Sequence, residues 1–208
     1  EGIIVEDDVI IRKEALHWMS TSLTSYRQNM ECFMISAQSI LQENTSGFFI
    51  ARSKVPLIWG WATWKDRWDL VKSDYSDWTS MNKMLEMGYS LKYALQILSN
   101  YTGIKKGKLD TWDTDILLWL VTNNAYCLAP SVNLSENIGI GIADATHTSE
   151  GLPAAYLFNK REYDNFMHKL ENLPLEDVSA NSTMKQIYKI HKKSTFRIFL
   201  NLIRNKIW

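Results

Sequence analysis

Short apolar runs alternate with longer segments of helical spacing along much of this chain, and this alternation limits the available folds more than any other feature. Apolar runs of this length predict buried strands, whereas apolar residues three and four positions apart predict amphipathic helices. Strands that alternate with helices are typical of a layered α/β domain. Strands are predicted at 2–5, 31–36, 48–50 and 125–128, and helices at 13–29, 80–86, 91–99 and 112–122.

The predicted strands are too few to close a barrel or to fill a wide sheet. The chain also opens directly on an apolar run, with Glu1 in place of a methionine. Its 208 residues are enough for one substantial domain and few for two. We therefore expect one α/β domain that lacks strands preceding residue 1.

Charge and cysteine content exclude several classes of protein. The chain has 23 Lys and Arg against 23 Asp and Glu, and this balance gives no reason to expect a nucleic-acid partner. Cys32 and Cys127 stand far apart without a CxxC spacing, which argues against a zinc ribbon or a disulfide scaffold and for a reducing compartment. No signal peptide or membrane-spanning run is visible, so we expect a cytoplasmic location.

Glu6, Asp7 and Asp8 directly follow the first predicted strand. In open α/β sheets, ligands bind beyond the carboxyl ends of the strands. Three adjacent carboxylates repel one another, and a divalent cation relieves that repulsion. Mg²⁺ is commonly held by one or two carboxylates together with substrate phosphates. The triplet suits a metal–diphosphate, although a solvated acidic turn that caps the next helix would look the same.

Four of the nine tryptophans fall within ten positions, at Trp59, Trp61, Trp64 and Trp68. Indole rings suit the apolar faces of sugars, and they also make good core. A spacing of four predicts that Trp64 and Trp68 share one face of a helix. Gly60 between two indoles would let the backbone approach a ligand closely. For any single tryptophan, core is the favoured interpretation.

Asp110, Asp113 and Asp115 precede or begin a predicted helix. Acidic residues are favoured at helix N-termini for structural reasons alone, and without further context this interpretation is preferred. The functional interpretation is a general base that removes a proton from an acceptor hydroxyl. His147 lies in a predicted loop over 134–149. A histidine there could bind a metal or a phosphate, or it could be an exposed residue without a role.

The order of these features resembles a known family. A strand leads into Glu6-Asp7-Asp8-Val9, and the later segments are Trp59 to Trp61, Trp112-Asp113, Pro130, Asn137-Ile-Gly139 and Thr146-His147. This order is similar to that of the GT-A glycosyltransferases related to N-acetylglucosaminyltransferase I. Bacterial sugar transferases of surface-polysaccharide pathways are also similar, particularly through 59–64 and 137–148. The resemblance covers residues 2–150.

The resemblance implies a GT-A-like sheet with flanking helices that lacks its N-terminal nucleotide-binding strands. Residues 1–158 would be the metal-site and acceptor-side part, and 159–208 a helical C-terminal extension. The implied activity is metal-dependent transfer of a hexosyl or N-acetylhexosaminyl group from a nucleotide-sugar, with a UDP-sugar favoured. The acceptor would be a glycan or a lipid-linked sugar, and the transfer would invert the anomeric configuration.

The resemblance also implies a role for each matching position. Asp8 would bind Mn²⁺ or Mg²⁺, with His147 near the metal or the diphosphate. Asp113 would be the catalytic base, with Asp110 as the fallback. The remaining positions would contact the nucleotide ribose or the donor sugar: Glu6, Asp7, Trp59, Gly60 and Trp61.

The segment 189–208 reads as a basic amphipathic helix, with six Lys or Arg residues interleaved with apolar ones. Such a helix can bind an anionic membrane surface, which would place the protein at the inner face of the membrane. It can equally pack on another part of the protein or on a partner.

The sequence is also compatible with two other functions. A catalytically inactive carbohydrate- or partner-binding module could use the same fold. A phosphotransferase could use the acidic triplet for Mg²⁺, but the chain has no P-loop Gly-Lys-Ser/Thr.

Overall fold

The two most apolar predicted strands form the centre of a six-stranded mixed sheet in the computed structural model, which describes residues 1–39, 47–71, 77–139 and 160–190. These are β3 (Cys32–Ser36) and β6 (Tyr126–Pro130), which pair in parallel and are buried along their whole length. The strand order is β1-β5-β3-β6-β4-β8. The other strands are β1 (Gly2–Ile4), β5 (Trp61–Thr63), β4 (Ile50–Ser53) and β8 (Leu175–Val178).

Strand directions determine which ends of the strands lie together. β5 is antiparallel to both β1 and β3, so β1, β3 and β6 run the same way. Their carboxyl ends therefore lie at one edge of the sheet. β4 is antiparallel to β6 and parallel to β8.

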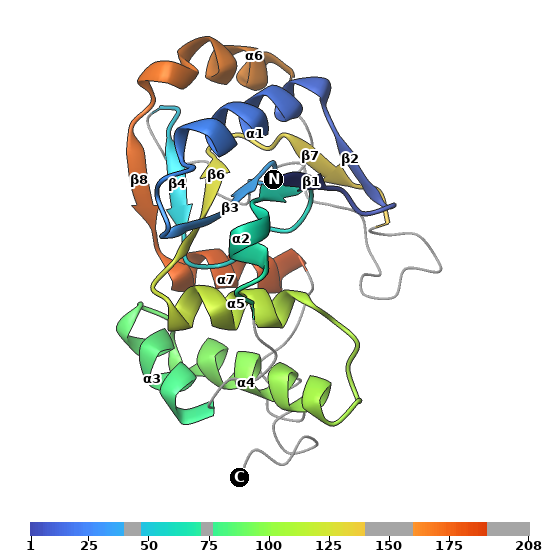
Figure 1. The fold of residues 1–208 in the computed structure, drawn as a ribbon, viewed down its shortest axis with the longest axis vertical. Helices are drawn as coiled ribbons and strands as arrows, with labels where there is room; N and C mark the ends of the chain where they lie inside the picture. Colours follow the sequence, from blue (N-terminus) through green and yellow to red (C-terminus); the bar gives the residue numbers. More distant parts are fainter. Residues whose placement is uncertain (40–46, 72–76, 140–159, 191–208) are drawn as a thin grey trace.

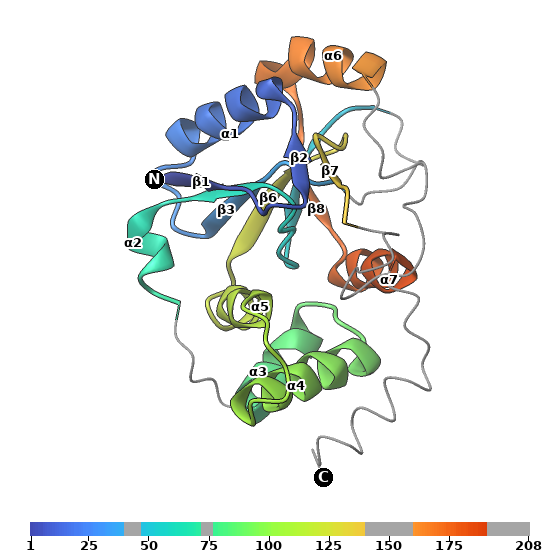
Figure 2. The same cartoon turned by 90° about the vertical axis from the view of Figure 1, so that its right-hand side faces the viewer.

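Helices cover both faces of the sheet (Figure 1). Helices α1 (Lys13–Ser25) and α6 (Lys160–Lys169) lie on one face, and α5 (Asp113–Thr122) and α7 (Ala180–Ile190) on the other. Figure 2 shows α3 (Asp77–Glu86) and α4 (Leu91–Lys105) packed outside α5. Two short helical turns complete the described part, α2 (Lys65–Trp68) and a 3₁₀ turn (Leu170–Asn172).

The alternation of side chains along β6 explains why both faces are covered. Tyr126 and Leu128 belong to the core cluster shared with α1, and Cys127 and Ala129 to the cluster shared with α5. Successive side chains of a strand point to opposite faces, so an apolar run of this kind needs a helix on each side. The chain is thus a layered α/β fold, as the sequence predicts.

Two expectations about the first 29 residues are wrong. The strand at 2–5 was expected to be buried, but β1 lies at the sheet edge, with Gly2 exposed and Ile3 37% exposed. The helix predicted over 13–29 begins at Lys13 but ends at Ser25. The buried face of α1 holds Ala15, Trp18, Met19, Ser22 and Leu23.

A second, two-stranded sheet pairs β2 (Val9–Ile11) with β7 (Ser135–Asn137) in antiparallel register. Neither strand was expected from the sequence, and β7 lies where a loop over 134–149 was predicted. This ribbon follows the acidic triplet directly and lies beside the main sheet (Figure 1).

The chain after residue 159 also contributes to the sheet. β8 pairs with β4 from Ile50–Leu175 to Ser53–Val178, and Phe166 of α6 is fully buried against Trp18 at a ring-centroid distance of 5.8 Å. The part expected as a helical extension therefore includes an edge strand and core residues of the same sheet. Within the described ranges, no helix has the length and apolar character needed to span a bilayer.

Candidate functional site

Carboxylates from two distant parts of the chain act electrostatically on one another beyond the carboxyl end of β1. Glu6, Asp7 and Asp8 occupy the turn between β1 and β2, where Val9 N donates to Glu6 O at 3.1 Å. Burial raises the pKa of Glu6 above 4.5, and the charges of Asp8, Asp113 and Asp7 raise it further, in that order. Asp113, the first residue of α5, therefore acts on the same group as the triplet.

The β2–β7 ribbon fixes the position of Asp8. Asn137 Nδ2 donates to Asp8 Oδ2 at 3.2 Å, and Ile138 N donates to Asp8 O at 2.8 Å. Gly139 packs so closely that a β-carbon there would lie 2.6 Å from Asp8 Oδ2. Asn137 Oδ1 in turn accepts from Gly139 N at 2.9 Å, which locks the amide orientation. Asn137 and Gly139 belong to the segments through which the sequence resembles the glycosyltransferase family, but the sequence predicts no role for them.

Asp113 is oriented by two neighbouring hydroxyls. Thr111 Oγ1 donates to Asp113 Oδ1, and Thr114 Oγ1 lies 3.4 Å from the same oxygen. Within the described part of the chain, no hydrogen bond reaches Oδ2. One carboxylate oxygen is thus held while the other is available to a ligand.

The two other acids of this segment differ from Asp113. Asp110 is exposed in the loop before α5, and it is not among the groups that raise the pKa of Glu6. The pKa of Asp115 is raised from 3.8, first by burial and also by Asp113, while Lys105 lowers it. Of these acids, Asp113 is the one whose charge raises the pKa of Glu6.

The cation implied by the family resemblance, Mn²⁺ or Mg²⁺, takes oxygen ligands. In the described ranges, no ion pair compensates any of the four carboxylates of the triplet and Asp113. Over the same ranges, no group of three or more His, Cys, Asp or Glu side chains is arranged to hold a metal alone. The oriented carboxylate of Asp8 fits a cation that takes most ligands from phosphates and water, and does not fit an all-protein cage.

The tryptophan segment lies beside this site but is largely buried. Trp59 is 8% exposed and Trp61 2% exposed, so their rings belong mainly to the core. Gly60 has φ +74°, and a β-carbon there would lie 2.5 Å from Ile11 Cγ2 on β2. Gly60 therefore allows close approach of a strand, in place of the ligand expected there.

Trp64 and Trp68 do not share a helical face as predicted. Trp64 is the N-cap of α2 and is 1% exposed, whereas Trp68 at the end of that helix is 45% exposed. The helix has only four residues, and Trp64 precedes it with an extended backbone. A spacing of four therefore does not place both rings on one helical face.

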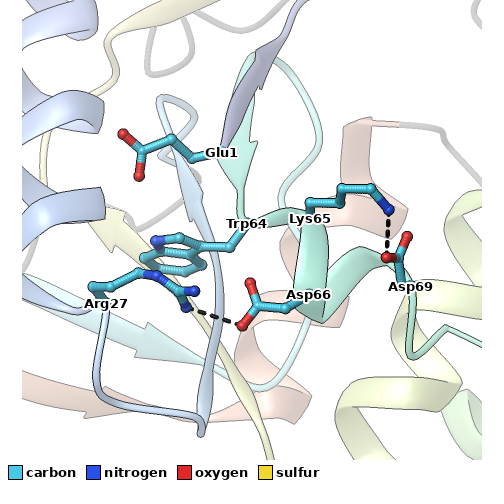
Figure 3. Close-up of a pocket in the computed structure, with 6 residues that line it drawn as sticks. All are labelled: Glu1, Arg27, Trp64, Lys65, Asp66 and Asp69. Carbon is cyan, nitrogen blue, oxygen red and sulfur yellow. Dashed lines mark hydrogen bonds and ion pairs between the residues drawn. The ribbon is translucent and has the colours of Figure 1, made fainter.

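A pocket of about 330 Å³ lies elsewhere, lined by Glu1, Arg27, Trp64, Lys65, Asp66 and Asp69 (Figure 3). Four of its five charged side chains pair with one another, Arg27 with Asp66 at 2.9 Å and Lys65 with Asp69 at 2.5 Å. Neither the triplet nor Asp113 lines it. We therefore place the candidate site at the carboxylates and not at this pocket.

His147, expected near the metal, lies outside the described residues. Comparison of the sequence with protein-family models finds no match, and comparison with curated proteins finds none either.

Proposed function

We propose that this chain forms the metal-site and acceptor-side part of a GT-A-like glycosyltransferase. It would transfer a hexosyl or N-acetylhexosaminyl group from a nucleotide-sugar, with a UDP-sugar favoured, to a glycan or lipid-linked acceptor. The observation that carries the proposal is the position of Asp113 directly after Trp112, whose ring stacks on Trp61 at the edge where β1 and β3 end. This edge is where open α/β sheets bind ligands. The charge of Asp113 also acts on Glu6.

Asp8 would hold Mn²⁺ or Mg²⁺, with Asn137 and Gly139 keeping its carboxylate in place. When bound, the cation would supply charge neutralisation to the leaving diphosphate. Four carboxylates without ion pairs in the described residues repel a bare diphosphate, so nucleotide binding should require the metal.

Asp113 would be the general base. Its Oδ2 would accept the proton of an acceptor hydroxyl as that oxygen bonds to the anomeric carbon and the bond to the diphosphate breaks. Thr111 fixes the other oxygen, so the carboxylate is oriented before the acceptor arrives. Attack opposite the leaving group would invert the anomeric configuration.

Glu6 and Asp7 would contact the ribose or the donor sugar. The raised pKa of Glu6 follows from its burial and its acidic neighbours, and a bound cation would relieve the second of these causes. Sugar hydroxyls are suitable donors to such carboxylates.

The second candidate function is a catalytically inactive carbohydrate- or partner-binding module. It is supported by the exposed ring of Trp112 next to Asp113, which a sugar could contact without a metal. Such a module would bind sugar without any need for metal or nucleotide.

Calorimetric titration of UDP with and without Mn²⁺, with GDP as a second nucleotide, separates the two candidates. We expect UDP binding that requires Mn²⁺ and is lost in Asp8→Ala. The control is Glu176→Ala, which removes an exposed carboxylate on β8. β8 is the outer strand on the side of the sheet away from β1. Failure of UDP and GDP to bind with Mn²⁺ to a form extended before residue 1 would contradict the transferase and leave the module.

The membrane contact proposed for 189–208 concerns residues that lie almost entirely outside the described ranges. If it exists, deletion of these residues should abolish sedimentation with anionic liposomes. Equal sedimentation of the full and the shortened chain would remove the proposal, and with it the reason to place the protein at the inner face of the membrane.

A further inference from the structure

Three tryptophans from separate elements meet next to Asp113. The ring of Trp61 lies 5.6 Å from that of Trp112 at an interplanar angle of 25°, and 5.8 Å from that of Trp68 at 39°. Trp61 belongs to β5, Trp68 to α2, and Trp112 immediately precedes α5. The stack therefore joins the sheet to two helices.

Only the outer members of this stack are accessible. Trp61 is 2% exposed, whereas Trp68 is 45% and Trp112 37% exposed. The buried Nε1 of Trp61 has no hydrogen-bond partner among the described residues, so packing and not hydrogen bonding holds this ring. Trp61 thus supports two indoles that remain open to solvent.

Both exposed rings contact the same buried ring, and exposed apolar surface gathered in this way is a candidate binding surface. The charges nearby select the ligand. Trp112 is adjacent to Asp113, with Cα atoms about 3.8 Å apart, and Asp113 lies in the field of Glu6. An anionic ligand would be repelled there, whereas a neutral ring with hydroxyl groups could stack on indole and donate to carboxylate.

We infer that Trp112 and Trp68 form a subsite for a neutral hexopyranose that presents an apolar C–H face, and that this sugar is the acceptor. The second part rests on the proposed function, because it takes Asp113 as the base. The inference moves the sugar contact from Trp59 and Trp61, which are buried, to Trp112 and Trp68. A sugar stacked on Trp112 would lie near Asp113, the next residue along the chain.

The test uses methyl β-D-glucopyranoside and methyl β-D-galactopyranoside as probes, with saturation-transfer NMR as the readout. We expect transfer to the ring C–H protons of at least one glycoside. Its affinity should fall by about threefold to tenfold in Trp112→Ala and in Trp68→Ala, and should be largely kept in Trp112→Phe. The matched control, Leu91→Ala, removes a 55%-exposed apolar side chain on α4 and should change nothing.

Glucose 6-phosphate provides the charge comparison and should bind more weakly than the methyl glycoside. Equal binding of the two, no transfer from either glycoside, or transfer that survives both alanine variants would overturn the subsite. Manganese-dependent UDP binding is measured on the same samples. If glycoside binding depends on Trp112 while UDP binds neither this chain nor a form extended before residue 1, the sugar subsite stands and the transferase proposal falls. If UDP binds with Mn²⁺ while neither glycoside binds, the sugar subsite falls and the transferase proposal stands.

Discussion

Gly139 lies directly against the carboxylate of Asp8: a β-carbon on Gly139 would fall 2.6 Å from Asp8 Oδ2 and 3.1 Å from Asp8 Cβ. The two residues meet because Ile138 N donates to Asp8 O and extends the β2–β7 ribbon beyond its paired residues. A methyl group at Gly139 would therefore displace the carboxylate without changing any charge.

Gly139→Ala should weaken manganese-dependent UDP binding by about tenfold, which corresponds to about 1.4 kcal/mol. The free energy of unfolding should fall by less than about 1 kcal/mol, since the displaced atoms end a short, half-buried side chain. Calorimetry and urea denaturation measure the two effects. Gly2→Ala is the control, because nothing lies within 4 Å of a β-carbon there. Unchanged UDP affinity would show that the position of Asp8 does not matter to the nucleotide.

Asp113→Asn should reduce the release of UDP from a UDP-sugar by about 10²-fold or more, as expected for loss of a general base. UDP affinity should stay within about twofold, because the base contacts the acceptor and not the nucleotide. Asp110→Asn removes the same charge from an exposed loop position three residues earlier and should leave the rate nearly unchanged. A larger rate loss in Asp110→Asn would reverse the assignment of the base.

Glu6→Gln should stabilise the protein near neutral pH. Because the folded-state pKa of Glu6 is raised above 4.5, its charged form is disfavoured by folding. That penalty is fully present above the folded pKa and disappears as the pH falls below 4.5. The free energy of unfolding at neutral pH should rise by up to about 1 kcal/mol, a modest value because the site is half exposed and screened.

Urea denaturation at neutral pH and at about pH 4 checks the sign for Glu6→Gln, and the gain should shrink at high salt. Glu176→Gln, at an exposed position of β8, should show no comparable gain. Destabilisation of Glu6→Gln at neutral pH would mean that the charge of Glu6 is stabilised in the folded state, contrary to the direction of its pKa shift.

Gly60→Ala should cost more stability than Gly88→Ala, although both glycines have positive φ, at +74° and +84°. An alanine in the left-handed region costs about 1–2 kcal/mol, and this should be the whole effect at Gly88, where nothing lies within 4 Å. At Gly60 the clash with Ile11 Cγ2 should add about 1–3 kcal/mol. Equal losses in denaturation would mean that β2 moves away without cost.

Arg67→Lys should destabilise the protein by about 2–3 kcal/mol. The guanidinium of Arg67 is fully buried and lies 3.4 Å from the centroid of the Trp64 ring. Its Nη2 lies 2.8–3.2 Å from three backbone carbonyls after α1, those of Tyr26, Arg27 and Asn29. A lysine ammonium cannot reproduce the flat stack of the guanidinium on the indole.

The control for Arg67 is Arg27→Lys. Arg27 is half exposed and pairs with Asp66 at 2.9 Å, so its replacement should cost less than about 1 kcal/mol. Thermal and urea denaturation compare the two. Losses of similar size would show that the buried carbonyl contacts of Arg67 contribute little.

The parts of the fold that sequence patterns predict are those with enough apolar residues to show a period. β3, β6 and α5 were expected close to their observed bounds, since their apolar runs are long and continuous. β7 and β8 read Ser-Glu-Asn and Leu-Glu-Asp-Val, which carry no strand signal. These segments are strands because β2 and β4 offer them free edges, a long-range cause that local pattern does not contain.

The residues of the candidate site were likewise predictable only in part. Glu6, Asp7, Asp8 and Asp113 stand out in the sequence because carboxylates follow a strand or begin a helix. The roles expected for Trp59 and Trp61 depended on exposure, and burial depends on what packs above each ring. Period and spacing could not show that Ile11 would cover Gly60, or that Trp61 would lie beneath Trp112.

The pairing of β8 with β4 has a consequence for how the protein is made. Arg52 and Asp177, joined by an ion pair of 2.7 Å across these strands, are 125 positions apart. At about 5–20 residues per second, the ribosome needs on the order of ten seconds to synthesise the intervening chain. During that interval the outer edge of β4 has no partner from its own molecule, and an unpaired edge is a template for other chains. Crowded polysomes are therefore where this protein is most exposed to aggregation, and chaperones that shield nascent strands would act on β4.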